Sequence, residues 1–256
     1  MDQKGTDVAG GGFSRVVFPS SRKDVCYKLL PPDTALLEIK ALAACQGCEA
    51  VMQLLETQTL YGGTQELTKL TFRRMQCDLS TCVSTLSDAQ KQSVWKQLCV
   101  GVNFMHAKRV AHLDLKLENV LVDFEGETCV VRITDFGLSM TDLDPDQMVE
   151  ACPRGTVWYV APEVVARRAF NPFAADAYSF GILIFALFLQ KFPYDIEKPS
   201  YTLFGEYQIR HRMTPLESVV KIWPNFVEDV FKVPSEVQEF INSTALIRPE
   251  ERLRKF

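Results

Sequence analysis

The sequence contains no apolar run long enough to cross a membrane. Its most apolar stretch, FGILIFALFL at 180–189, is about half of the roughly 20 residues that a membrane-spanning helix needs, so it predicts a buried core helix. The N-terminal MDQKGTDVAGGG lacks the basic start and the apolar stretch of a secretory signal. We therefore expect no membrane partner and a cytoplasmic or nuclear location.

A strong charge of either sign and paired cysteine motifs are also missing. The net charge is -4 and the pI is about 5.5, which disfavours a general electrostatic grip on nucleic acid. The eight cysteines include a lone CxxC at Cys45 and Cys48, but no second pair or histidine follows at zinc-ligand spacing. We predict no nucleic-acid partner and mostly buried, reduced thiols.

No low-complexity segment or internal repeat interrupts the chain. Hydrophobic residues make up 47% and charged residues 23% of its 256 residues, a balance that is typical of a globular protein. A chain of this length buries a sizeable core in one large domain or in two lobes. We favour two lobes.

What the sequence does contain is the stretch VAHLDLKLEN at 110–119. Asp114 and Asn119 are five positions apart, enough for a tight loop that directs an acid at a hydroxyl and an amide oxygen at a metal ion. Lys116 between them neutralises phosphate. These are the parts needed for phosphoryl transfer.

The same stretch resembles the HRDLKxxN catalytic loop of eukaryotic protein kinases. DFG at 135–137 and APE at 161–163 follow in the order of that family. The HLDLK form is similar to the loop of myosin light-chain kinase relatives, and lysine two places after the aspartate is typical of serine/threonine kinases, as is GTVWYVAPE at 155–163.

The resemblance implies one α+β protein kinase domain over residues 1–256. We expect a small antiparallel β-sheet lobe with one helix at 1–75, and a larger, mostly α-helical lobe at 76–256. The chain stops four residues after Arg252, earlier than the family's last helix, so we expect a shortened C-terminal lobe. The implied cofactors are ATP and Mg²⁺, and the implied partners are proteins that carry serine or threonine.

The N-terminal stretch AGGGFSRVV resembles the kinase glycine-rich loop, in which backbone N–H groups approach phosphate oxygens closely. Ala9 and Ser14 stand where the outer two glycines of that loop would be. An ordinary glycine-rich hairpin is the alternative interpretation. The nucleotide-covering residues would be Ala9, Gly10, Gly11, Gly12, Phe13, Ser14 and Val16.

The strand pattern VCYK places Lys28 where the family has its phosphate-binding lysine. Pro31 and Pro32 end this strand, and Asp33 is expected to cap a helix that reaches Ala44. Glu38 lies in the middle of that helix and would hold the ammonium group of Lys28. The two residues are ten positions apart, which requires a minimal connection or a shortened helix.

The segment LTFRRMQCDL at 70–79 resembles the kinase hinge. Phe72 matches the gatekeeper, Arg73 and Met75 would offer backbone groups to adenine, and Asp78 would reach ribose. The alternative is an edge strand that ends in a helix cap at Asp78.

Site roles follow from the resemblance. Asp114 would be the catalytic base and Lys116 would contact the transferring phosphoryl group, while Asn119 and Asp135 would hold Mg²⁺. Thr156 would bond both Asp114 and Lys116. Glu118 occupies a position that in some kinases pairs with an arginine of the substrate.

Further positions concern regulation and structure. Leu113 replaces the arginine that usually receives an activation-loop phosphate, and leucine cannot bind phosphate, so we expect activity that does not depend on it. Asp176 would hold the catalytic-loop backbone, and Arg252 would pair with Glu163. His112 would brace the backbone and transfer no proton.

Two other functions compete with the protein serine/threonine kinase. The first is a pseudokinase scaffold that binds ATP or partners with little or no transfer. Altered glycines, the short Lys28 to Glu38 spacing, Leu113 and the early end favour it, whereas the presence of Lys28, Asp114, Asn119 and Asp135 opposes it. The second is a small-molecule kinase of the aminoglycoside type, which the APE segment disfavours.

Overall fold

The computed structural model describes residues 8–9, 14–62, 65–152, 154–195 and 197–256. Its strands are β1 (Val8–Ala9), β2 (Arg15–Val17), β3 (Val25–Leu30), β4 (Leu54–Gly62), β5 (Gln65–Arg73), β6 (Cys77–Asp78), β7 (Val120–Glu125) and β8 (Thr128–Ile133). Its helices are α1 (Pro32–Ala44), α2 (Leu79–Cys82), α3 (Asp88–Ala107), α4 (Pro162–Val165), α5 (Pro172–Leu189), α6 (Pro199–His211), α7 (Pro215–Ile222), α8 (Val227–Lys232) and α9 (Ser235–Thr244).

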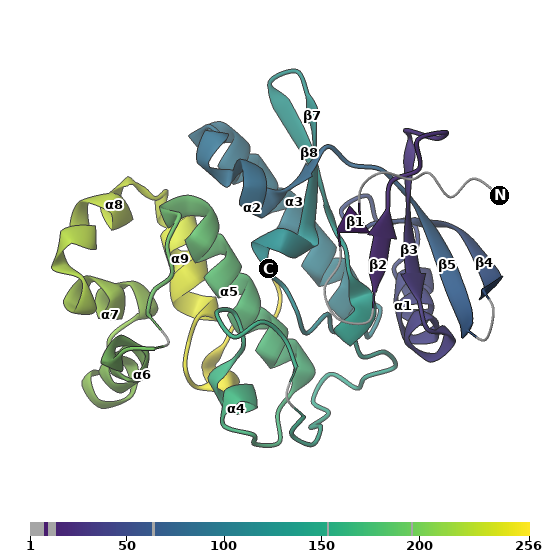
Figure 1. Cartoon of the computed structure of the whole chain (residues 1–256). Helices are drawn as coiled ribbons and strands as arrows, with labels where there is room; N and C mark the ends of the chain where they lie inside the picture. The colour runs from purple at the N-terminus through teal and green to yellow at the C-terminus, as the bar shows by residue number, and fades with distance from the viewer. Residues whose placement is uncertain (1–7, 10–13, 63–64, 153, 196) are drawn as a thin grey trace.

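The N-terminal part is an antiparallel five-stranded sheet in the order β1-β2-β3-β5-β4, with α1 packed against β4 and β5. Figure 1 shows this sheet on one side and a mostly helical body on the other, with the short sheet β6-β7-β8 between them. The two-lobed α+β fold expected from the sequence is confirmed.

The helix that carries Glu38 begins two residues earlier than its predicted cap implies. Pro31 is the N-cap and its neighbour Pro32 is the first helical residue, so Asp33 lies in the first turn and caps nothing. Proline is favoured at this position because it has no backbone N–H to leave unsatisfied and its φ angle is already helical. The prediction of Asp33 as the cap is therefore wrong.

The minimal connection predicted between Lys28 and Glu38 is present. β3 ends at Leu30 and α1 starts at Pro32, so only Pro31 separates them. After α1, Val51 forms an isolated bridge to Ile133, and β4 starts at Leu54.

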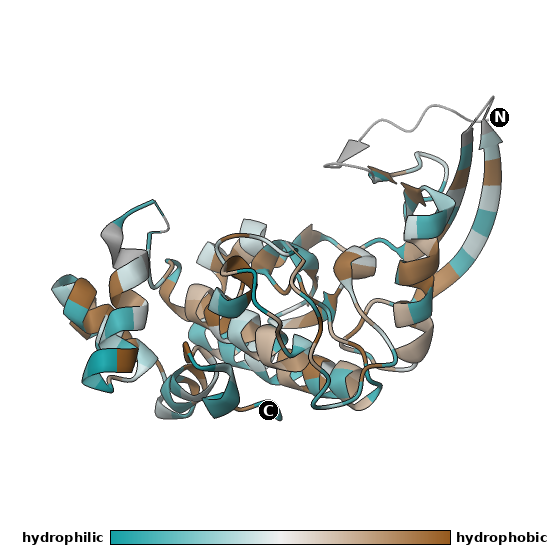
Figure 2. Ribbon diagram, turned by 90° about the horizontal axis from the view of Figure 1, so that it is seen from below, coloured by the Kyte–Doolittle hydropathy of each residue, from teal (hydrophilic) through white to brown (hydrophobic). Residues whose placement is uncertain are grey.

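Helix α5 is the centre of the larger lobe. It contacts α3 and α9, and its buried residues run from Pro172 to Leu187. By length and composition this helix resembles a membrane span, but 89% of it is buried inside the protein. The predicted core helix is confirmed, and Figure 2 shows brown, hydrophobic residues concentrated where the helices of the larger lobe meet.

A buried ion pair holds the C-terminal end of the chain against this lobe. Arg252 donates to both carboxylate oxygens of Glu163 at 2.6 and 2.9 Å, as predicted across 89 positions. The same guanidinium also donates to the carbonyl of Ala174. Four residues later, Phe256 packs edge-on against Phe180 and Phe240.

All eight cysteines carry free thiols. Cys45, Cys48, Cys82 and Cys129 are buried, and the others are partly buried. Burial raises the pKa of Cys45 and of Cys99 to about 12, so these two thiols stay protonated and unreactive at neutral pH.

Candidate active site

One buried carboxylate fixes the backbone of the catalytic loop. Asp176, in α5, is fully buried and accepts hydrogen bonds from the backbone N–H of His112 and of Leu113, each at 2.7 Å. His106 Nε2 lies 3.0 Å from the same carboxylate. Leu113 has φ 63°, a left-handed conformation that is strained for a leucine. The role expected of Asp176 as an anchor is present in the structure.

His112 ties the loop to the segment before Asp135. Its Nε2 donates to the carbonyl oxygen of Thr134 at 2.9 Å, and its Nδ1 accepts from the backbone N–H of Asp114 at 3.2 Å. Because the ring is fully buried and both nitrogens are engaged, His112 braces the backbone and has no free nitrogen for acid–base chemistry.

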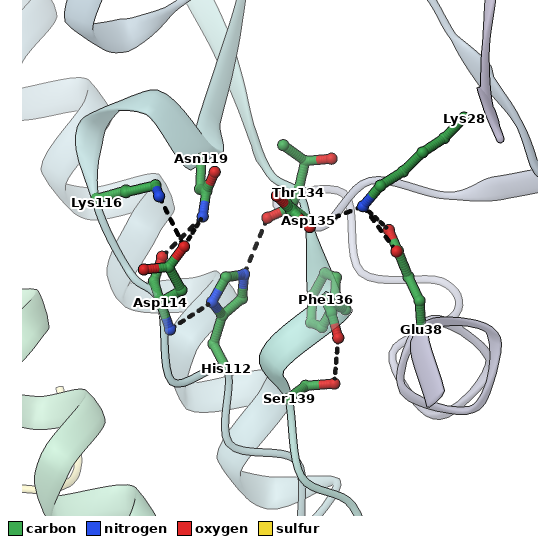
Figure 3. A network of polar contacts seen from close by, with 10 residues as sticks. All are labelled: Lys28, Glu38, His112, Asp114, Lys116, Asn119, Thr134, Asp135, Phe136 and Ser139. Atoms are coloured by element: carbon green, nitrogen blue, oxygen red, sulfur yellow. Dashed lines mark hydrogen bonds and ion pairs between the residues drawn. The ribbon is translucent and has the colours of Figure 1, made fainter. Parts of the chain in front are cut away.

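Asp114 is held by three polar side chains, two of which Figure 3 shows. Thr156 Oγ1 donates to its Oδ1 at 2.8 Å, Asn119 Nδ2 donates to its Oδ2 at 3.0 Å, and Lys116 Nζ lies 2.7 Å from Oδ2. Lys116 also donates to Thr156 Oγ1 at 2.7 Å. The contacts predicted from Thr156 to both residues are therefore formed, and they leave Asp114 little rotational freedom.

Gly155 is required beside this cluster. Its φ is 89°, and a Cβ at this position would lie 2.9 Å from the carbonyl oxygen of Leu113. Only glycine allows the segment carrying Thr156 to approach the catalytic loop this closely.

Lys28 lies between two carboxylates, one from each side of the site (Figure 3). Its Nζ is 2.9 and 2.7 Å from the two oxygens of Glu38, and 2.7 Å from Asp135 Oδ1. Lys28 and Glu38 are buried, whereas Asp135 is only partly buried. The ion pair expected between Lys28 and Glu38 is present despite the short spacing.

The charges of this trio are set by burial and by one another. Burial lowers the pKa of Lys28, but the two facing carboxylates outweigh it and the net pKa is raised. Burial likewise raises the pKa of Asp135, yet the charge of Lys28 outweighs it and the net pKa is lowered. Lys28 and Asp135 are thus both ionised at neutral pH.

Asn119 and Asp135 offer oxygens that suit a magnesium ion. The amide nitrogen of Asn119 donates to the backbone carbonyl and the carboxylate of Asp114, and Figure 3 shows its amide oxygen on the other side, away from Asp114. Asp135, at φ 64°, uses Oδ1 for Lys28. One carboxylate and one amide oxygen fit Mg²⁺, which takes few protein ligands and completes its shell with water and phosphate.

The predicted hinge residues lie at the end of β5 and in the segment that follows it. Phe72 is buried in β5 opposite Cys26 of β3. Met75 lies between Arg74 and Gln76, whose N–H groups donate to the carbonyls of Asp24 and Val122. Within the part of the chain that the structure describes, the N–H of Met75 donates to no backbone carbonyl. Arg73 is the last residue of β5, where it lies opposite Val25 of β3.

Asp78 is a helix cap, as the alternative interpretation held. Its carboxylate accepts from the N–H of Thr81 at 3.0 Å and from the hydroxyls of Ser80 and Thr81. These bonds engage both oxygens, because three donors of the first turn of α2 lie next to it. The predicted ribose contact would have to share a carboxylate oxygen with these donors.

The remaining predicted positions lie outside the described residues, at β1 and β2, or beside the catalytic loop. Gly10, Gly11, Gly12 and Phe13 lie outside the described residues. The backbones of β1 and β2 pair antiparallel, with Ala9 opposite Val16, and Ser14 directly precedes β2. Glu118 is exposed beside the catalytic loop.

Sequence reasoning missed Cys26. Side chains alternate along a strand, so Cys26 and Lys28 project from the same face of β3. The signal was available in VCYK, where the thiol stands two residues before the lysine. Cys26 thus lies on the sheet face that the Lys28 ammonium group occupies.

The fold and this arrangement of Lys28, Asp114, Asn119 and Asp135 define the architecture of a phosphotransferase. The family model of the protein kinase domain matches residues 18–254. The chain belongs to the eukaryotic protein kinase family, of the serine/threonine type.

Curated relatives agree with this assignment. The chain is 27% identical over 169 residues to the probable serine/threonine-protein kinase KCC4 of Saccharomyces cerevisiae, covering 66% of this chain and 15% of that protein. It is 30% identical over 168 residues to the Arabidopsis thaliana serine/threonine-protein kinase SRK2F, and the match covers 65% of this chain and 44% of that protein. It is 38% identical over 123 residues to the Arabidopsis CBL-interacting serine/threonine-protein kinase 8, and the match covers 47% of this chain and 26% of that protein. The chain spans less than half the length of each of these relatives.

The position of Cys26 yields a test of nucleotide binding that does not need catalysis. We expect Mg²⁺–ATP to slow maleimide alkylation of Cys26, because a nucleotide held by Lys28 would cover the same face of β3. Burial raises the pKa of this thiol, so the reaction is run at mildly alkaline pH and followed by peptide mass spectrometry. Cys152, which lies in a different segment, serves as the internal control. Equal alkylation of Cys26 with and without nucleotide would contradict the placement.

Proposed function

We propose that this chain transfers the γ-phosphate of ATP to serine or threonine hydroxyls of proteins, with Asp114 as the catalytic base. The observation that carries the proposal is the complete contact set around Asp114, in which Lys116, Asn119 and Thr156 all lie within hydrogen-bonding distance. The proposal includes a single kinase domain, with an N-terminal lobe at 1–75 and a C-terminal lobe at 76–256.

Each side chain has a defined task in the reaction. Asp114 orients the substrate hydroxyl and accepts its proton; a positioned base of this kind contributes about 100-fold to 10,000-fold. Lys116, which pairs with Asp114 and Thr156 in the structure, turns to the transferring phosphoryl group. Thr156 keeps both residues in place throughout.

The nucleotide would be held on the opposite side of the site. Lys28 contacts the α and β phosphates while Glu38 prevents it from turning away. Asn119 and Asp135 would hold Mg²⁺, which neutralises charge that develops on the phosphates. The N–H of Met75 and the backbone of Arg73 would bond adenine beside Phe72, and residues 9–16 would cover the phosphates.

The pseudokinase alternative has lost one of its supports. The short spacing of Lys28 and Glu38 was a reason to doubt catalysis, but the ion pair forms at 2.7 Å. Ala9 and Ser14 in place of glycines, and Leu113 in place of arginine, still favour it. Glu118, exposed next to the loop, supports a preference for basic substrates, which equal rates on basic and neutral peptides would rule out.

The activation segment, residues 138–154, carries three aspartates that form ion pairs. Asp142 pairs with Lys40 of α1 at 2.5 Å, Asp144 pairs with Arg109, and Asp146 lies 3.4 Å from Arg254. These three pairs join the activation segment to α1, to Arg109 after α3 and to Arg254.

Apolar packing supplements these charges. Leu143, between the first two aspartates, is buried, and its backbone exchanges hydrogen bonds with Arg109. Leu113 is also buried and has no charge with which to receive a phosphate. We propose that the active conformation needs no phosphorylation of this segment.

Replacing Asp114 tests its role as the catalytic base. Asp114→Asn should lower transfer of radiolabelled γ-phosphate to a mixed Ser/Thr/Tyr peptide library by at least about 100-fold, because asparagine cannot accept the proton. The label should appear on serine or threonine. Asp88→Asn, which makes the same change at the exposed start of α3, should retain activity. No transfer by the folded wild-type chain, despite nucleotide protection of Cys26, would favour the pseudokinase.

Phosphatase treatment and removal of two aspartates test whether the activation segment needs phosphorylation. Phosphatase treatment should leave kcat/KM unchanged, whereas the double variant Asp142→Asn, Asp144→Asn should lower it about fivefold, since exposed ion pairs are individually weak. Asp229→Asn, which removes an aspartate from a pair with Lys232 in α8, is the control. Loss of activity on phosphatase treatment would refute phosphate independence.

A further inference from the structure

Two cavities flank helix α6, which Figure 1 shows at the end of the larger lobe that lies far from the five-stranded sheet. Their volumes are about 480 and 390 Å³. Ile209 and Ile247 line both cavities. We call the two cavities together the α6 groove.

The smaller cavity is mostly apolar and begins at α4, and the paired side chains of Glu206 and Arg210 also line it. Pro162, Tyr178 and Phe204 line it. Pro162 opens α4, in the segment that also carries Thr156. A protein bound with its hydroxyl at Asp114 could therefore extend into this cavity with an apolar side chain. Ile209, which is 47% exposed, adds apolar surface that is available to such a ligand.

The larger cavity is basic. Arg212 and Arg248 line it, against a single acidic residue, Glu251. Arg248 is 3.1 Å from Glu251 in an exposed pair that can exchange partners at little cost. Among the residues that the structure describes, no carboxylate lies within ion-pair distance of Arg212. This cavity therefore has unmatched positive charge.

A buried donor lies in the wall of the same cavity. Gln208 accepts the N–H of Ile247 with its Oε1 at 3.0 Å, which fixes the orientation of its amide. Its buried Nε2 has no hydrogen-bond partner in the described part of the chain. A buried donor without a partner is unfavourable, so an acceptor oxygen that reaches it on binding would be stabilised.

We propose that the α6 groove docks an acidic segment of the protein substrate, outside the residues around the phosphorylated hydroxyl. Apolar side chains of the segment occupy the cavity beside Phe204, and its carboxylates pair with Arg212 and Arg248. The inference rests on the proposed kinase function for the identity of the ligand as a substrate. Docking at a distance from the reacting atoms lowers KM and leaves kcat unchanged, because the contacts are the same in the ground and transition states.

Binding is tested first, without ATP. The probe is a fluorescein-labelled peptide of alternating leucine and glutamate, titrated with the full chain and followed by fluorescence anisotropy. Arg212→Gln should weaken binding about fivefold, as expected for an exposed charge pair. Ile209→Ala should weaken it about tenfold through lost apolar contact. Lys96→Gln, which removes a charge from the exposed side of α3, should have no effect.

Three outcomes of the titration would overturn the proposal. They are equal affinity for a peptide of alternating leucine and lysine, equal affinity for a single-stranded oligonucleotide of the same charge, and acidic-peptide binding that Arg212→Gln leaves unchanged. Circular dichroism of both groove variants checks that they are folded. Both altered side chains are exposed, so we expect native spectra.

Kinetics then connects the groove to the reaction. A serine peptide that carries the acidic, leucine-rich extension should have a KM about fivefold lower than the same peptide without it, at equal kcat. Arg212→Gln should abolish this difference and leave the short peptide unaffected. If the extension gives no advantage to the wild type, the docking role fails. If neither peptide is phosphorylated while the anisotropy results hold, the kinase function fails and the binding groove stands.

Discussion

The site depends on one buried ammonium group held between two carboxylates. Lys28 comes from the sheet, Glu38 from α1, and Asp135 from the segment that leads into the larger lobe, and all contacts are between 2.7 and 2.9 Å. Removing a charge from water is costly unless it is paired. The trio therefore ties α1 and the Asp135 segment to β3, and a shift of Lys28 would leave the buried carboxylate of Glu38 without its partner. The nucleotide side of the site is preorganised by this requirement.

The other half of the site is organised by a second buried carboxylate. Asp176 binds two successive backbone N–H groups of the catalytic loop and holds Leu113 in a left-handed conformation. The loop that carries Asp114 is therefore attached to a helix, α5, that is almost wholly buried. His112 then links this loop to Thr134, next to Asp135. The two halves of the site are thus joined through backbone hydrogen bonds as well as through the Lys28 trio.

The sequence predicted those features that depend on short, ordered motifs. The resemblance of these motifs to the kinase family implied the two-lobed fold, the Lys28–Glu38 pair, the Thr156 contacts and the Arg252–Glu163 pair. The roles of Asp33 and Asp78 were harder to predict from the sequence. An aspartate near the start of a helix suits an N-cap and other roles equally, and only the backbone geometry decides between them. Lys40 and Asp142 are 102 positions apart, and no motif marks their approach. The α6 groove is likewise invisible in the sequence, since its lining comes from segments that meet only in the fold.

The measurement that tests the role of the Lys28 trio most directly is the steady-state kinetics of Glu38→Gln with ATP as the varied substrate. We predict that kcat/KM falls at least about tenfold, because hydrogen bonds to charged groups contribute roughly 1.5–3 kcal/mol and Lys28 would be left to pair with Asp135 instead of phosphate. Glu56→Gln, an exposed change in β4 of the same sheet, should retain wild-type values. A folded Glu38→Gln protein with unchanged kcat/KM would show that the ion pair does not organise the site.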